Sequence, residues 1–113
     1  MDSPREIRDG EEFVLETLKT YLLENNINAD DLSIKQFPSG YSNLTYFLKS
    51  SSEEFVLRRP PFGAKSLQGG HDMFREYNVL KNLKSQFLKV PDVYLYCDNS
   101  EIIGAPFYLM ERV

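Results

Sequence analysis

The sequence has 113 residues, a length typical of a single domain. Its composition is 42% hydrophobic and includes eight Phe and seven Tyr, so a core can form, although a small domain buries a modest share of its surface. The net charge is −4, and no run of basic residues is longer than Arg58-Arg59. This balance argues against a nucleic-acid-binding surface, which needs a basic stripe.

Cysteine usage and hydropathy bear on the compartment. The single cysteine, Cys97, cannot form an internal disulfide, which fits a reducing environment. The polar residues 1–6 lack the apolar stretch of a secretory signal. No window approaches the ~20 apolar residues that span a bilayer. We therefore expect a soluble, cytoplasmic protein.

The first part of the chain predicts a flexible tail over residues 1–8, followed by a helix. Asp9 and Glu12 have the spacing of a capping box, in which side chains satisfy free backbone N–H groups. The helix is expected from about Gly10 to Asn25, because apolar residues recur there at helical spacing. These residues are Phe13, Val14, Leu18, Tyr21 and Leu22.

Three short strands are predicted next, at Leu32–Phe37, Asn43–Lys49 and Glu54–Arg58. Leu32 and Ile34 alternate with polar residues in the first, and Leu44, Tyr46 and Leu48 alternate with Thr45 and Phe47 in the second, as expected for strands with one buried face. Pro60-Pro61 ends the third strand, because proline has no N–H to donate to a sheet.

The second part predicts a loop over Phe62–Gly70, a helix from His71 to about Phe87, and strands at Val93–Tyr96 and Ala105–Met110 joined by a turn at 98–100. The expected fold class is α+β, a five-stranded antiparallel sheet with the second helix packed on one side and an extra N-terminal helix. The expected core residues are Leu32, Ile34, Leu44, Tyr46, Leu48, Val56, Met73, Tyr77, Leu80, Leu95, Phe107 and Leu109.

The turn between the first two strands, Ser39–Asn43, is rich in small residues. Such a turn lets backbone N–H groups approach an anion, which is how phosphate-binding loops work. Any hairpin also favours Ser, Gly and Asn, so an ordinary turn is the alternative.

Arg58 and Glu76 form the second candidate feature. Arg58 follows Val56 and Leu57 at the end of a strand, much as the kinase lysine ends its Val-Ala-Ile-Lys strand. Glu76 lies in the following predicted helix, where a kinase places the carboxylate that holds the phosphate-binding cation. The alternative is two solvated side chains. Arg59 would point to the opposite face of the strand, and we prefer Arg58.

Residues 107–113 form the third candidate feature, an apolar strand that turns polar at its end. In kinase-like folds such a strand leads to the hinge, where backbone groups pair with the adenine edge. An ordinary sheet strand is the alternative for this segment alone. Together, the three features favour the kinase-like interpretation.

Five runs taken together resemble the aminoglycoside phosphotransferase superfamily. They are Phe-Pro-Ser-Gly-Tyr-Ser-Asn-Leu-Thr-Tyr (37–46), Phe-Val-Leu-Arg-Arg-Pro-Pro (55–61), His-Asp-Met-Phe-Arg-Glu-Tyr-Asn-Val-Leu (71–80), Val-Pro (90–91) and Ile-Gly-Ala-Pro-Phe-Tyr-Leu-Met-Glu-Arg (103–112). The branch that looks most similar is the kinase domain fused to some acyl-CoA dehydrogenases. The resemblance covers roughly residues 30–113. It implies a kinase-like N-terminal lobe over 9–113 that stops at the hinge.

The resemblance also implies roles for individual residues. The loop 39–43 would cover the nucleotide phosphates, Arg58 would replace the phosphate-binding lysine, and Glu76 would hold it. Met110 would be the gatekeeper, and the Glu111 carbonyl and Val113 N–H would pair with adenine. The implied nucleotide-binding residues are therefore Ser39, Gly40, Tyr41, Ser42, Asn43, Arg58, Glu76, Met110, Glu111 and Val113.

Two departures from the family pattern matter. Most members have lysine where this chain has Arg58, although the planar arginine fork also binds phosphate. The catalytic His-Gly-Asp motif, its downstream Asn and the metal-binding Asp are expected after the hinge, and the sequence stops at Val113. His71 is most simply a group at the start of a helix. We expect no catalytic residue or metal ligand in this chain.

The expected function is the nucleotide-binding lobe of an ATP-dependent small-molecule phosphotransferase with a hydroxyl acceptor, inactive by itself. ATP and Mg²⁺ are the implied cofactors, with the Mg²⁺ ligands and the acceptor pocket in a missing C-terminal lobe. No nucleic-acid or membrane partner is expected. The alternatives are a stand-alone interaction or regulatory module that self-associates through its exposed lobe interface, and an unrelated small α+β domain.

Overall fold

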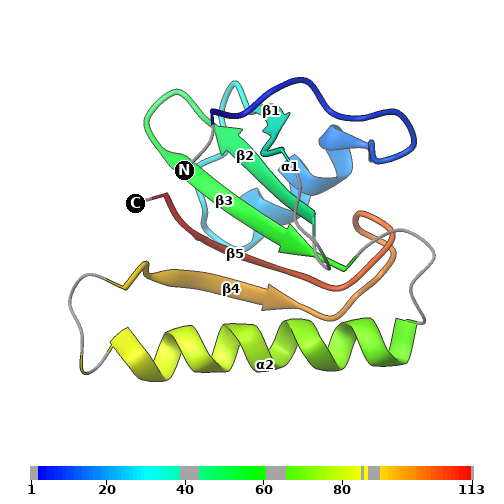
Figure 1. Cartoon of the computed structure of the whole chain (residues 1–113). Helices are drawn as coiled ribbons and strands as arrows, with labels where there is room; N and C mark the ends of the chain where they lie inside the picture. Colours follow the sequence, from blue (N-terminus) through cyan, green and yellow to red (C-terminus); the bar gives the residue numbers. More distant parts are fainter. Residues whose placement is uncertain (1–2, 39–43, 61–65, 85, 87–89, 113) are drawn as a thin grey trace.

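The computed structural model describes residues 3–38, 44–60, 66–84, 86 and 90–112, with only the backbone for 66–72. The predicted order of helix, three strands, helix and two strands is confirmed. The elements are α1 (Leu15–Glu24), β1 (Ser33–Gln36), β2 (Leu44–Lys49), β3 (Glu54–Arg59), α2 (Ser66–Lys84), β4 (Val93–Cys97) and β5 (Phe107–Glu111). The five strands form one antiparallel sheet in the order β1-β2-β3-β5-β4 (Figure 1). The predicted α+β fold class is therefore confirmed.

The two helices cover opposite faces of this sheet. Leu18 and Leu22 of α1 share a core cluster with Leu57 of β3 and Leu109 of β5, which are register partners. Neighbouring residues of a strand point to opposite faces. The α2 helix contacts β3, β4 and β5, and its Glu76 bonds Arg58, on the face opposite Leu57. The central strand β3 is thus covered on both sides.

Most of the expected core is found. Leu44, Tyr46, Leu48, Val56, Met73, Phe107 and Leu109 are buried, and Leu32, Ile34 and Leu95 pack against the core cluster. Tyr77 and Leu80 are half-buried. The prediction omitted Phe55 and Leu57, which are also buried. A strand buried on both faces carries a continuous apolar run, so an alternation rule selects only half of it.

The predicted start of the first helix is wrong. The helix begins at Leu15, and Val14 is its N-cap with no side-chain hydrogen bond, so the Asp9–Glu12 capping box does not form. Gly10 has a positive φ of 83°, and its N–H donates to the Glu12 carboxylate instead. This conformation favours glycine and is not helical.

Part of the expected tail 1–8 pairs with the edge of the sheet. Arg5 forms an antiparallel bridge with Gln36 of β1, and the Arg8 N–H donates to the Gln36 side chain at 2.9 Å. The Gln36 amide in turn donates to the Glu11 carboxylate at 2.8 Å. These bonds lead the chain along β1 before α1 begins.

The second helix also differs from its predicted bounds, which ran from His71 to about Phe87. It begins at Ser66 and ends at Lys84, so it includes Gly69 and Gly70. Each glycine costs about 1 kcal/mol relative to alanine within a helix, but such propensities are weak priors that tertiary context overrides. No helix in the described parts of the chain is long and apolar enough to cross a membrane.

Tyr46 predicts a pH dependence of stability. Its side chain is fully buried, and its hydroxyl donates to the Glu11 carbonyl at 2.7 Å. Burial raises the pKa of Tyr46 from 10.0 to about 12, against the lowering effect of the nearby Arg59 charge. A folded-state pKa above the unfolded one stabilises the fold below pH 10, and this stability is lost as the pH rises toward 12. The loss is about 1.4 kcal/mol per pH unit.

Urea unfolding at several pH values between 9 and about 12 checks this expectation. Tyr46→Phe loses the hydroxyl hydrogen bond at every pH, yet its free energy of unfolding should decline less steeply in the alkaline range. Equal alkaline slopes in the two proteins would contradict the assigned pKa shift.

Candidate functional site

Arg58 and Glu76 form a two-pronged ion pair between β3 and α2. The Arg58 Nε donates to Glu76 Oε1 at 2.9 Å, and Nη2 donates to Oε2 at 3.3 Å. The side chains are 27% and 31% exposed, respectively. The structure therefore brings together the two residues whose spacing suggested a kinase-like pair.

Two further side chains complete what we call the Arg58 network. The Tyr108 hydroxyl of β5 donates to Glu76 Oε1 at 2.8 Å, and Arg58 Nη1 donates to Thr45 Oγ1 of β2 at 2.9 Å. Thr45, Arg58 and Tyr108 are register partners on three adjacent strands. The sheet thus places all three side chains in one row under α2.

The charges of this network reinforce one another. Burial disfavours the charged guanidinium of Arg58, but the hydrogen bonds and charge of Glu76 outweigh it and raise its pKa. Burial and the Glu76 charge also raise the pKa of Tyr108. At neutral pH Arg58 is charged, and the Tyr108 hydroxyl keeps the proton that it donates.

Arg58 retains donors beyond these bonds. A guanidinium carries five N–H groups, and the bonds to Glu76 and Thr45 use Nε–H and one hydrogen on each terminal nitrogen. One hydrogen on Nη1 and one on Nη2 are therefore not used by Glu76 or Thr45. An anionic oxygen can accept from such N–H groups in charge-assisted hydrogen bonds.

A pocket of about 480 Å³ lies against the network, between α2 and the sheet. Arg58 and Glu76 line it together with Tyr108 and Met110. Its other walls are mainly apolar and come from α2 and the segment before β4; they include Val79, Leu80 and Pro91. The predicted gatekeeper Met110 therefore shares a cavity with the predicted ion pair.

Arg59 has a different environment on the opposite face. Its side chain is buried, with Nε donating to the Pro60 carbonyl at 2.9 Å and Nη1 to the Ile103 carbonyl at 3.0 Å. Burial lowers the pKa of Arg59. These bonds tie the end of β3 to the loop before β5, which is a structural role. Of these two neighbouring arginines, Arg58 is the one that lines the pocket beside Glu76, which Arg75 of α2 also lines.

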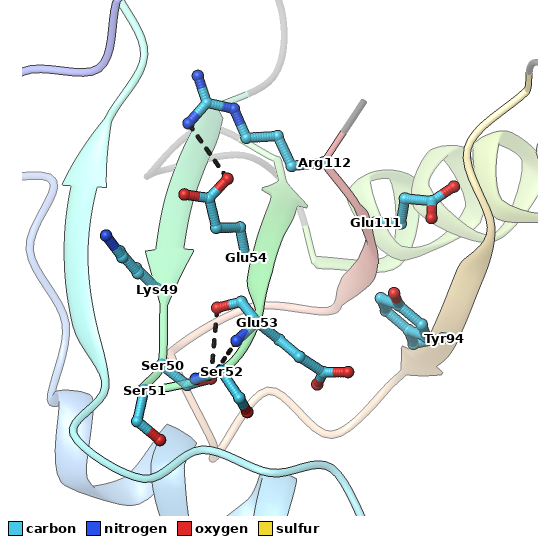
Figure 2. A pocket seen from close by; sticks show the side chains of 9 residues that line it. All are labelled: Lys49, Ser50, Ser51, Ser52, Glu53, Glu54, Tyr94, Glu111 and Arg112. Atoms are coloured by element: carbon cyan, nitrogen blue, oxygen red, sulfur yellow. Dashed lines mark hydrogen bonds and ion pairs between the residues drawn. The ribbon is translucent and has the colours of Figure 1, made fainter.

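Glu111 lies at the far end of β5, against a second pocket of about 460 Å³ (Figure 2). Its backbone N–H donates to the Asp92 carbonyl at 2.8 Å, and its carboxylate accepts from the Asp92 N–H at 3.1 Å. Arg112 reaches toward Glu54, 3.8 Å away, and its guanidinium lies 4.5 Å from the Phe47 ring centroid. The expected hinge is thus attached to both β3 and the start of β4.

Several predicted site residues lie outside the described residues. These are the phosphate loop, Ser39, Gly40, Tyr41, Ser42 and Asn43, and Val113 at the hinge. Only the backbone of His71 is described, within α2. Among the side chains that the structure describes, no three His, Cys, Asp or Glu residues gather where they could hold a metal ion.

The sequence interpretation missed Tyr108 and Thr45. Strand alternation alone places Tyr108 on the same face as Met110, two residues later, so a signal existed. The pairing of Tyr108 and Thr45 with Arg58 depends on the sheet register. That register could not be read from the sequence.

Comparison with known proteins supports the predicted resemblance. A family model described as the phosphotransferase enzyme family matches residues 33–113. A solved structure from Ralstonia eutropha JMP134, assigned to the aminoglycoside phosphotransferases, is 31% identical and aligns with a TM-score of 0.75. The alignment covers 90% of this chain and 28% of that one. The predicted superfamily and the α+β fold expected for it are confirmed.

Curated relatives support the predicted branch. The rat acyl-CoA dehydrogenase family member 11 is 38% identical over 96% of this chain and 14% of its own length. The chicken member 11 is 41% identical over 75% of this chain and 11% of its own. The mouse member 10 is 37% identical over 85% of this chain and 9% of its own. The chain therefore spans a small part of each relative.

The contrast between Arg58 and Arg59 gives a stability prediction. Arg59→Met should lower the free energy of unfolding by about 2 kcal/mol or more, because it removes the donor from two carbonyls, and each acceptor left unsatisfied costs about 1–3 kcal/mol. Arg58→Met should cost less than about 1 kcal/mol, since its ion pair is partly exposed. Urea denaturation of both variants at pH 7 measures the difference. A larger loss for Arg58→Met would contradict the division of roles.

Proposed function

The chain belongs to the phosphotransferase enzyme family, and from this premise we propose that it is the nucleotide-binding N-terminal lobe of an ATP-dependent small-molecule phosphotransferase. The reaction is phosphoryl transfer from ATP to a hydroxyl acceptor. The observation that carries the proposal is the two-pronged Arg58–Glu76 pair beside the Met110 pocket. Phosphoryl transfer depends mainly on positioning and charge stabilisation, which such a cation supplies.

Arg58 contacts the ATP phosphates in this proposal. Glu76 holds one edge of the guanidinium, and we assign to a phosphate oxygen the hydrogens of Nη1 and Nη2 that Glu76 and Thr45 do not use. Charge-assisted bonds of this kind are about twice as strong as neutral ones. Because the guanidinium is permanently charged, it does not lose this role at any physiological pH.

In the same proposal, the adenine base of ATP lies toward the end of β5. Tyr108 is level with Arg58, and Met110 and Glu111 follow on the same strand. At about 3.4 Å per residue, Glu111 lies roughly 10 Å further along the strand than Tyr108. We assign the Glu111 carbonyl and the Val113 N–H to the adenine edge, and Ser39–Asn43 to the phosphates. The phosphates and the base would then occupy opposite ends of one strand.

Catalysis needs parts beyond these residues. A carboxylate must orient the acceptor hydroxyl, and Mg²⁺ must neutralise the phosphates. We propose that a C-terminal lobe supplies both, along with the acceptor pocket. The N-terminal lobe described above would then have no activity by itself. The proposed location is the cytoplasm, and ATP and a hydroxylated small molecule are the proposed partners.

A second candidate function is an interaction module. The α2 side chains Phe74 and Val79 are 47% and 50% exposed, and Leu83 is 36% exposed. Exposed apolar side chains of this kind favour a protein partner or self-association. This role would not depend on Arg58, which separates it from nucleotide binding.

Titration of the ¹⁵N-labelled chain with MgATP tests the proposed function. Amide shifts should concentrate on residues 39–43, 58, 76 and 110–113. Arg58→Met should weaken binding about tenfold or more, because hydrogen bonds to charged groups contribute about 1.5–3 kcal/mol.

Arg5→Met is the matched control, since it removes the same charge from an exposed residue at the β1 edge. Its MgATP affinity should equal that of the wild type. Equal losses in both variants would indicate a general charge effect. An unchanged affinity in Arg58→Met, or no binding by the wild type, would count against the proposal.

A further inference from the structure

The Arg58 network has more members than a cation and its carboxylate. Thr45, Arg58 and Tyr108 occupy one row across β2, β3 and β5, with Arg58 in the middle. Glu76 meets this row from α2. Both strand neighbours of Arg58 therefore have polar groups beside the ion pair.

Each neighbour restrains a different part of the pair. Tyr108 and Arg58 Nε donate to the same oxygen, Glu76 Oε1, at 2.8 and 2.9 Å. The carboxylate therefore cannot turn without losing the tyrosine bond. Thr45 accepts from Arg58 Nη1 at 2.9 Å, on the terminal nitrogen that Glu76 does not contact. Together they fix the carboxylate and the plane of the guanidinium.

The ion pair needs such restraint because it is partly exposed. Long charged side chains lose much rotamer entropy when held in one geometry, and exposed pairs contribute little energy to hold them. Tyr108 is 2% exposed, and its ring lies 6.4 Å from that of Tyr77. A buried aromatic ring on an inner strand of the sheet is a far stiffer support than either charged side chain.

We propose that Tyr108 and Thr45 are positioning residues that hold the Arg58–Glu76 pair in one geometry, with the N–H groups of Arg58 that Glu76 and Thr45 do not use directed at a phosphate group of the nucleotide. The choice of a nucleotide phosphate as the ligand rests on the proposed function, whereas the restraint on Arg58 does not. A merely structural Tyr108 would support the fold and leave the motion of the Arg58 guanidinium unchanged.

The test measures the exchange rate of the Arg58 Nε–H with solvent by ¹⁵N NMR, in the wild type and in Tyr108→Phe. The variant keeps the ring and removes only the donor to Glu76. The exchange should become about 3- to 10-fold faster, as expected for the loss of one hydrogen bond within the network. Thr45→Val, which keeps the side-chain shape, should also make the Arg58 Nε–H exchange faster. This second variant provides the test if Tyr108→Phe does not fold.

Tyr94→Phe is the matched control, because Tyr94 is a half-exposed tyrosine on the neighbouring β4. Its Arg58 Nε–H exchange should equal that of the wild type. Unchanged exchange in both Tyr108→Phe and Thr45→Val would overturn the positioning role. So would an equal acceleration in the Tyr94 control.

MgATP binding provides the second readout. Tyr108→Phe should bind MgATP about 3- to 10-fold more weakly than the wild type, with Tyr94→Phe unchanged. Faster Arg58 exchange with an unchanged ATP affinity would overturn the phosphate-directed part of the inference. Faster exchange together with no ATP binding by the wild type would uphold the restraint on Arg58 and overturn the nucleotide as its ligand.

Discussion

Arg58 places a permanent positive charge on the central strand of a small domain. Such a charge needs a partner, and the partner is the Glu76 carboxylate. β3 lies between α1 and α2, so Arg58 cannot simply extend into water as an edge residue would. The carboxylate from α2 compensates the lost hydration and ties the helix to the sheet. Because that bond spans two elements, the position of α2 and the orientation of the guanidinium depend on each other. The geometry of the candidate site is therefore set by the way α2 lies on the sheet.

Arg58 and Arg59 follow one another in β3, and strand geometry places their side chains on opposite faces of the sheet. Arg58 faces α2, where it bonds Glu76 and lines a pocket, and two of its hydrogens are not used by Glu76 or Thr45. Arg59 faces the other side, where its donors bond two carbonyls in a buried position. Burial lowers the pKa of Arg59, whereas the carboxylate raises that of Arg58. The same residue type thus has a structural role on one face and a proposed ligand-binding role on the other.

The sequence predicted the elements that depend on local pattern. Proline and turn residues separate the strands, and the spacing and strand-then-helix order of Arg58 and Glu76 indicated the ion pair that the structure contains. The predictions were wrong or incomplete where tertiary contacts determine the bounds of an element or the partners of a side chain. Gln36 and Glu11 draw the chain along the sheet edge, so α1 starts later than its apolar periodicity indicates. The contact between Tyr108 and the Arg58–Glu76 pair was not predicted, because it depends on the β3–β5 register, which no short segment encodes.

The central claim is that Arg58, held by Glu76, contacts the phosphates of ATP. A crystal structure of the chain with Mg²⁺ and a non-hydrolysable ATP analogue tests it most directly. The expected result is a phosphate oxygen about 2.7–2.9 Å from Nη1 or Nη2 of Arg58, with Glu76 still bonded to Nε. Phosphates bound elsewhere, with the Arg58 guanidinium out of contact, would contradict it.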